Sequence, residues 1–258
     1  MQFKRFAVVV ALIAVALPSF ALAAKEEFDW SGSVAPGQTV EIKGVNGDIV
    51  AEPVAGGAVD VHAVKSSRRD DPGEVTIEII EHAGGVTVCA VYPGKNNNCE
   101  PGPNGNLGAK DNDVTVSFTI GVPAGVNFVG QTVNGSIEIK DLDAGARANT
   151  VNGNVNLSVD GAAQANTVNG SIRASMGRAD WDGELAFNTV NGSITIDLPS
   201  DASADISVKT LNGSISTDFP ITVSGKFTGK SARGTIGSGG RDLSVETVNG
   251  SVKLRNKG

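Results

Sequence analysis

Apolar and polar residues alternate in short runs along most of the chain, as they do in half-buried β-strands. In the second half, the runs flank a recurring element, Thr-Val-Asn-Gly, with Leu in place of Val in one copy. In most copies, apolar side chains recur six and four positions before the Asn and three and five positions after it. The parity of the alternation therefore changes at Asn-Gly, which predicts a bend there. The copies begin at Thr132, Thr150, Thr167, Thr189, Thr210 and Thr247.

The copies are regularly spaced. From Asn134 to Asn249 there are six steps when the degraded copy Ser231–Gly234 is counted, and their mean is (249 − 134)/6, about 19 residues. A repeat near this length is typical of stacked coils in which each coil places the same side chain beside its neighbour. We therefore predict an all-β fold, a single-domain parallel β-solenoid that is β-helix-like. The alternative is a meander of antiparallel hairpins, each closed by a two-residue Asn-Gly turn.

Asn-Gly has a physical reason to form the bend, since both residues tolerate positive φ. In a stack of coils, the asparagines would lie above one another with their amides paired along the axis. The threonines two residues earlier would form a second file. We expect both files to be structural, and a ladder that faces a ligand is the alternative. The predicted asparagine ladder comprises Asn46, Asn134, Asn152, Asn169, Asn191, Asn212 and Asn249.

An earlier copy of the pattern surrounds Asn46, which lies 134 − 46 = 88 residues before Asn134. At about 19 residues per coil, the gap would hold four or five coils. We expect an irregular N-terminal β region at residues 24–125, which acts as a cap and is continuous with the repeat solenoid at 126–258. Ala83–Gly85 could close an antiparallel hairpin within it. Its alternating runs are Val59–Ala63, Val75–Ile79, Val86–Ala90 and Val114–Ile120.

The last alternating run carries three positive side chains, Lys253, Arg255 and Lys257. We expect them to guard the final edge of the stack, because charge on an edge strand opposes pairing with another chain. A protein that polymerises end to end is a hypothesis that these charges disfavour.

Residues 1–23 resemble a secretory signal peptide. Lys4 and Arg5 precede an apolar stretch of 12 residues, Phe6–Leu17, and Ala21–Ala23 has the small side chains of a cleavage site. The apolar stretch is short for a membrane span, which needs about 20 residues. We therefore expect an exported mature chain without a transmembrane segment, located in the periplasm, associated with the outer membrane or secreted.

The charge balance narrows the possible partners. The whole chain has a formal net charge of −7, and removal of Lys4 and Arg5 with the leader leaves 19 Lys and Arg against 28 Asp and Glu, a net charge of −9. A surface of this sign repels nucleic acid and anionic lipid. We expect an envelope or surface component, a glycan or a protein, as partner.

Two cysteines are present, Cys89 on a predicted strand and Cys99 in the long Gly-, Pro- and Asn-rich loop at 93–113. In an exported chain, such a pair is most simply a disulfide that pins the loop. A redox-active pair is the alternative, but the spacing is not Cys-x-x-Cys and no basic residue is adjacent to Cys89.

Residues suited to catalysis or metal binding are sparse. The two histidines, His62 and His82, lie in or beside alternating runs, where a structural role is expected. The acidic clusters Asp111–Asp113 and Asp180–Asp182 could offer oxygen ligands to calcium, but they lack the spacing of known calcium loops, so we expect solvated turns. We predict no catalytic residue, no metal and no cofactor.

Several elements together resemble a known family. They are Phe28–Trp30, Val45–Ile49, Cys89–Pro93 with Cys99, Val122–Gly125 and the Thr-Val-Asn-Gly-Ser-Ile file. The chain resembles the bacterial "putative adhesin" family, a domain of unknown function. The resemblance implies an exported, β-helix-like protein of the cell envelope with no established catalytic residues. This chain leaves no room for a membrane barrel after the repeats, so display as an autotransporter is not expected.

These observations favour a non-catalytic exported envelope protein, an adhesin or a structural β-solenoid that presents its ladder surfaces to a glycan or protein. The alternative is a polysaccharide lyase or hydrolase, whose acids would be Asp180 and Asp182.

Overall fold

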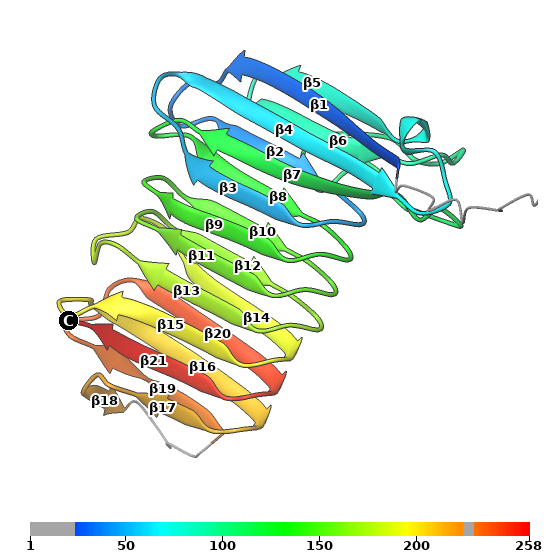
Figure 1. The fold of residues 1–258 in the computed structure, drawn as a ribbon. Helices are drawn as coiled ribbons and strands as arrows, with labels where there is room; N and C mark the ends of the chain where they lie inside the picture. The colour runs from blue at the N-terminus through cyan, green and yellow to red at the C-terminus, as the bar shows by residue number, and fades with distance from the viewer. Residues whose placement is uncertain (1–23, 224–229) are drawn as a thin grey trace, which may run out of the picture.

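The structure is a computed structural model that describes residues 24–223 and 230–258, so the expected signal peptide lies outside the described residues. The described chain is all-β, with two large, mostly parallel sheets that face each other (Figure 1). One short 3₁₀ helix, η1 (Pro72–Glu74), lies beside them. In spatial order, sheet A contains β1 (Ala24–Ser33), β4 (Ala58–Ser67), β7 (Thr115–Val122), β3 (Ile49–Pro53), β9 (Ile137–Leu142), β11 (Val155–Val159), β13 (Ile172–Met176), β15 (Ile194–Pro199), β21 (Val252–Lys257) and β17 (Ile215–Thr217).

Sheet B completes the second layer. In spatial order it contains β18 (Ile221–Val223), β19 (Ser231–Ile236), β16 (Ala204–Asn212), β20 (Asp242–Asn249), β14 (Leu185–Asn191), β12 (Ala163–Asn166), β10 (Ala146–Asn149), β8 (Asn127–Gln131), β2 (Thr39–Lys43), β6 (Gly85–Val91) and β5 (Thr76–His82).

Each Thr-Val-Asn-Gly element joins a sheet B strand to the next sheet A strand, as between β10 and β11. β12 pairs in parallel with β10 and β14, and the neighbouring bends are bridged directly, as Asn134 is to Asn152. Interpretation of the Asn-Gly pairs as antiparallel hairpins is therefore wrong. The arrangement is consistent with a solenoid, because each circuit adds one strand to each sheet.

The core lies between the two sheets, and the alternation seen in the sequence explains it. Val155, Leu157 and Val159 of β11 face inward and are buried, while Asn156 and Ser158 face outward. Sheet B contributes small side chains at the matching places, as with Ala163 and Ala165 of β12. Short strands can therefore stack closely with an apolar interior.

The spatial order of the coils departs from the chain order at both ends (Figure 1). The coil of β20 and β21 lies between that of β14 and β15 and that of β16 and β17. The coil of β2 and β3 similarly lies between that of β6 and β7 and that of β8 and β9. The last coil of the chain is thus paired on both sides of its strands, whereas β1, the first strand, lies at the edge of sheet A and pairs only with β4.

Of two expectations about the N-terminal region, one is wrong and one is confirmed. The 88-residue gap does not hold four or five coils; it holds one coil, β6 and β7, together with β4, β5 and the loop between β6 and β7. β5 and β6 form an antiparallel hairpin across Ala83–Gly85, as predicted. β4 is antiparallel to its neighbours β1 and β7, because the chain reverses between β3 and β4 and returns to sheet A without a strand in sheet B.

Two expectations about the C-terminal region are wrong. Ser231–Gly234 is no bend: it lies in β19, antiparallel to β16. Lys253, Arg255 and Lys257 do not guard a final edge, because β21 is paired on both sides. Arg255 instead binds Asp197 through Nε at 2.5 Å and Nη2 at 2.6 Å. No helix within residues 24–223 and 230–258 is long and apolar enough to cross a membrane.

Candidate functional site

The repeated threonines fasten each corner to the next coil. Thr167 Oγ1 donates to the carbonyl oxygen of Gly153 at 3.0 Å, and Thr150 Oγ1 donates to that of Gly135 at 2.8 Å. The same bond recurs in the other copies, and all six threonines are 4–6 % exposed. Each of these bonds gives a hydrogen-bond partner both to the buried hydroxyl and to the glycine carbonyl. The remaining pairs are Thr132 with Gly47, Thr189 with Gly170, Thr247 with Gly192 and Thr210 with Gly250.

The glycines are required for a reason that differs from the predicted one. A Cβ on Gly153 would lie 2.0 Å from the carbonyl oxygen of Gly135, and one on Gly170 would lie 1.9 Å from that of Gly153. Among the corner glycines only Gly47 has positive φ, at 129°. The expectation that positive φ forms each bend is therefore wrong; close approach of the next coil excludes a side chain.

The asparagines of the corners form a continuous amide chain. Asn152 Nδ2 donates to Asn134 Oδ1 at 2.8 Å, and Asn134 Nδ2 donates to Asn46 Oδ1 at 2.9 Å. Every link points the same way: the N–H donor of each pair is the residue farther from Asn46, and the acceptor is the residue nearer to it. The structure places the seven predicted ladder residues in the spatial order Asn46, Asn134, Asn152, Asn169, Asn191, Asn249 and Asn212.

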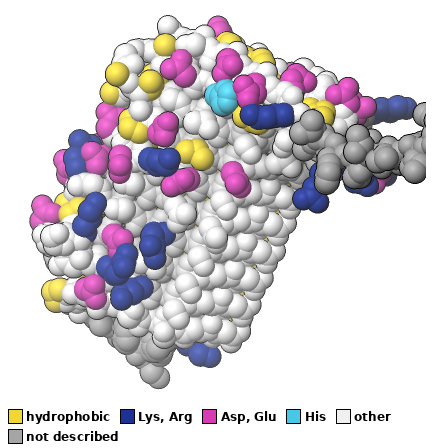
Figure 2. Space-filling model, in the orientation of Figure 1, with side chains coloured by type: hydrophobic (Ala, Val, Ile, Leu, Met, Phe, Trp, Pro, Cys, Tyr) yellow, Lys and Arg dark blue, Asp and Glu magenta, His cyan; other side chains and the backbone are white. Residues whose placement is uncertain are grey.

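A row of aliphatic side chains runs beside the corner asparagines and is exposed. Val151, Val168 and Val190 are each 39 % exposed and Leu211 is 60 % exposed. Figure 2, which looks onto sheet A, shows most charged side chains gathered away from the edge formed by the Thr-Val-Asn-Gly corners. The corner therefore presents a neutral strip whose amides are largely occupied by one another.

The loop at 93–113 folds over the outer face of sheet B. A disulfide joins Cys99 to Cys89 with a Cα–Cα distance of 5.8 Å. The Lys43 ammonium, almost fully buried, donates to three loop carbonyls, those of Glu100, Gly102 and Asn104. Covalent and ionic contacts thus hold the loop against the strands.

Glu41 provides the matching acceptor beneath the loop. Its Oε2 accepts from the Gly102 amide and from Thr87 Oγ1, both at 2.9 Å, and its Oε1 accepts from Gln131 Nε2 at 2.9 Å. Lys43 Nζ lies 3.7 Å from Oε1. A buried carboxylate with this many partners is part of the scaffold, so Glu41 and Lys43 are already paired.

The base of the loop is held by polar contacts. Tyr92 OH donates to the Val114 carbonyl at 2.8 Å, and burial raises the pKa of Tyr92 to about 12. Asp113 and Asp70 each accept from the backbone N–H of the other. The Asp70 N–H, with a contribution from Arg69, holds the pKa of Asp113 below its usual value. The predicted acidic turn at Asp111–Asp113 therefore has a structural partner.

Three adjoining hollows lie on the outer face of sheet B around the loop. Their volumes are about 490, 330 and 210 Å³. The first and second share Pro103, Gln131 and Asn149, and the first and third share Val129 and Arg147. We call this depression, defined by these five residues, the groove. Its floor is β8 and β10, and the loop forms one wall.

A second file of amides leads into the groove. Asn188 Nδ2 donates to Asn166 Oδ1, and Asn166 Nδ2 donates to Asn149 Oδ1, both at 3.0 Å. The sequence reasoning missed this file, although its signal was present: an Asn three positions before the corner Asn in three successive copies. Parallel, in-register pairing of β10, β12 and β14 brings the three side chains together.

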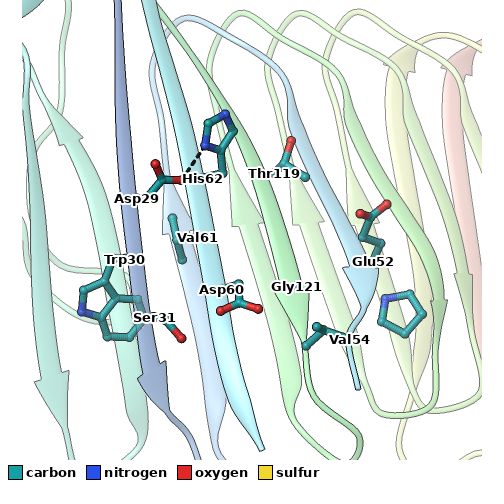
Figure 3. A pocket seen from close by; sticks show the side chains of 11 residues that line it. Asp29, Trp30, Ser31, Glu52, Val54, Asp60, Val61, His62, Thr119 and Gly121 are labelled. Carbon is teal, nitrogen blue, oxygen red and sulfur yellow. Dashed lines mark hydrogen bonds and ion pairs between the residues drawn. The ribbon is translucent and has the colours of Figure 1, made fainter. Parts of the chain in front are cut away.

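Sheet A has a hollow of its own near β1, of about 490 Å³ (Figure 3). His62 Nδ1 lies 2.7 Å from Asp29 Oδ1, and Asp60 and Glu52 are the cross-strand neighbours of Gly121 on its two sides. Figure 3 shows Trp30 away from these polar groups, and its ring packs against the core. The hollow is lined by acidic side chains, and its histidine is already paired.

Asp180 and Asp182, the acids expected if the protein is a polysaccharide lyase or hydrolase, line neither the groove nor the hollow of sheet A. Asp180 pairs with Arg178 at 3.5 Å, both side chains being more than half exposed, and Trp181 between the two acids is buried beneath Arg241. His82 lines the groove, with Nε2 3.2 Å from Thr87 Oγ1. Within residues 24–223 and 230–258, no group of three or more His, Cys, Asp or Glu could hold a metal ion.

Comparison with known proteins gives a family. The family model Toastrack DUF4097 matches residues 35–255. Similar solved structures include a "putative cell adhesion protein" from Clostridium sporogenes (12 % identity, 90 % of this chain and 100 % of that chain, TM-score 0.48) and a "putative adhesin" from Bacteroides fragilis (13 %, 90 % and 98 %, 0.36). A "putative lipid binding protein" from Parabacteroides distasonis also matches (11 %, 88 % and 96 %, 0.25). No curated protein matches the chain.

Proposed function

The chain belongs to the Toastrack DUF4097 family, which confirms the family resemblance seen in the sequence, and on that premise we propose that it is a non-catalytic binding protein of the cell envelope. Its binding site is the groove on sheet B, and its ligand is an extended surface polymer, a glycan. The protein is exported: the pattern of residues 1–23 and the disulfide Cys89–Cys99 both support this.

One observation carries the proposal. The groove combines adjoining hollows with the open end of an amide file: Asn188 and Asn166 donate along the file, and Asn149, which lines the groove, has no acceptor for its Nδ2 among the described residues. Amides offer donors and acceptors side by side, as the hydroxyls of a sugar chain require. Concave sites with an apolar floor and few convergent polar groups are the usual binding sites of proteins.

The scaffold fits this role. We propose that residues 24–258 form one solenoid domain, in which the region at 24–125 caps the repeats at 126–258. The amide and hydroxyl files of the corners are structural, because each polar group there is paired with the next coil. A site on paired strands of a rigid sheet holds its geometry better than one on loops.

The acid and the base that line the groove, Glu41 and His82, already have partners, which supports binding without turnover: His82 Nε2 lies 3.2 Å from Thr87 Oγ1, and its Nδ1 accepts from the Gly84 N–H at 3.2 Å. Glu41 is paired with four neighbours, and the acids Asp180 and Asp182 do not line it. General acid–base catalysis needs such a group within reach of the bond that breaks.

Glycan binding to the mature protein tests the proposal. Val129→Tyr fills the floor of the groove, and Val50→Tyr places the same bulk on the outer face of sheet A as a matched control. We expect Val129→Tyr to abolish retention of envelope polysaccharide in a pull-down and Val50→Tyr to retain it. Equal retention by both variants, or no retained glycan with the unaltered protein, would refute the proposed site. Release of shortened polymer, lost in Asp180→Asn, would instead establish the enzyme.

A further inference from the structure

We infer that the polymer in the groove is an acidic polysaccharide, whose carboxylates bind Arg147. This inference rests on the proposed function and specifies its ligand. Three observations support it: the groove contains an arginine without a partner among the described residues, the N–H groups of the amide file point toward the groove, and the backbones of β8 and β10 are already paired on both sides.

Arg147 is the free cation of the groove. It lies on the outer face of β10 and lines two of the three hollows. Within the described residues no hydrogen bond or ion pair is made by its guanidinium, whereas Lys43 is surrounded by carbonyls and Glu41. Its cross-strand neighbours, Val129 and Gln164, are uncharged. An arginine fork is suited to a carboxylate, which it binds with two parallel bonds.

The amide file reinforces this positive site. Asn188 donates to Asn166 and Asn166 donates to Asn149, so every amide dipole points its N–H end toward the groove. Asn149 Nδ2, the last donor, has no acceptor among the described residues. A chain of hydrogen bonds polarises its members in the same direction, which strengthens the final donor. Asn149 and Arg147 are two positions apart on β10, so they face the same side roughly 7 Å apart.

A sugar chain suits the groove better than a peptide does. The backbones of β8 and β10 are paired on both sides, so an extended peptide cannot add as a further strand. The residues that define the groove include no aromatic side chain to hold a proline-rich segment. The amides of Gln131 and Asn149 are instead spaced along the floor at the distance between strands, suited to a row of hydroxyls.

The contact with Arg147 is important for binding an acidic polymer because the protein as a whole is acidic. A mature chain with a net charge of −9 (19 Lys and Arg against 28 Asp and Glu, as counted above) repels a polyanion at long range. Selectivity for an acidic polymer therefore depends on a local contact in the groove.

The experiment measures affinity of the mature protein for a galacturonic acid oligosaccharide and for its methyl ester, which keeps the hydroxyls and loses the charge. We expect the free acid to bind on the order of tenfold or more tightly than the ester. Arg147→Gln should remove that preference and Arg147→Lys should restore part of it. Arg173→Gln is the matched control, since Arg173 is an exposed arginine on the outer face of sheet A with no hydrogen bond or ion pair to any residue that the structure describes.

The outcomes separate this inference from the proposed function. If Val129→Tyr blocks binding of acid and ester alike while Arg147→Gln changes neither, the groove binds glycans but the acidic preference is refuted. If neither oligosaccharide binds, the inference is refuted, and retention of envelope polysaccharide decides the proposed function separately. Binding of an acidic peptide in place of the oligosaccharide would also overturn the assignment to a polysaccharide.

Discussion

The Thr-Val-Asn-Gly corner and the groove lie on the same coils, but they use their polar residues in opposite ways. At the corner, Thr167 and Asn169 bond to the next coil, and the pattern recurs in every copy. In the groove, Arg147 and Asn149 Nδ2 have no partner in the part of the chain that the structure describes, and the neighbouring coils do not repeat Arg147. Repetition in this chain therefore marks what holds the stack together, and departure from it marks what is available to a ligand.

The most severe test of the corner is Gly153→Ala. Its new Cβ would lie 2.0 Å from the carbonyl oxygen of Gly135, so the coils must separate. We expect a loss of about 3 kcal/mol or more in the free energy of unfolding, measured by chemical denaturation. Gly57→Ala is the control, since a Cβ there meets nothing within 4 Å and its φ is not positive. A small, equal effect of both changes would show that the corner tolerates a side chain.

The next test concerns the wall of the groove. Replacing Cys89 and Cys99 with Ala opens a closure of 10 residues, and we expect a loss of about 2–3 kcal/mol on unfolding. Glycan affinity should fall too, because Pro103 loses a tether while the corner is untouched. The unaltered protein with reductant is the control and should show the same shift. Unchanged unfolding would mean that the contacts of Lys43 and Glu41 hold the loop without the disulfide.

The smallest effect is expected from Thr167→Val, which keeps the shape and removes the bond to the Gly153 carbonyl. We expect a loss of about 1 kcal/mol in denaturant unfolding, with glycan binding preserved. Thr195→Val on the outer face of β15, where no bond of the hydroxyl is lost, should be near neutral. Loss of glycan binding in Thr167→Val would contradict the separation of corner and groove.

Local patterns predicted the strands well. Alternation located the runs around Val155 and Ile172, and the change of parity located the bends, because burial of one face imposes a period of two on every strand. The hairpin at Ala83–Gly85 and the disulfide Cys89–Cys99 also followed from nearby residues. The reason given for glycine at the bends was wrong, because the constraint comes from the next coil and not from the bend itself.

The groove could not be predicted in the same way. Its floor comes from β8 and β10, and its wall comes from a loop more than twenty residues earlier, Pro103 being 26 positions before Val129. Lys43, earlier still, holds that loop in place. No single segment carries the signal, although the Asn file at 149, 166 and 188 was readable and was overlooked.

The sequence by itself determined the repeating unit, the inward and outward faces and the residues that meet between coils, because these depend on short-range alternation and on identical side chains. Only the tertiary structure decided which coils are neighbours. Asn249 lies between Asn191 and Asn212, yet all three have a Thr two positions before the Asn and Gly-Ser directly after it. Corners that share these residues can stack on one another in any order, and the order found here gives β20 and β21, the last coil of the chain, a paired neighbour on both sides.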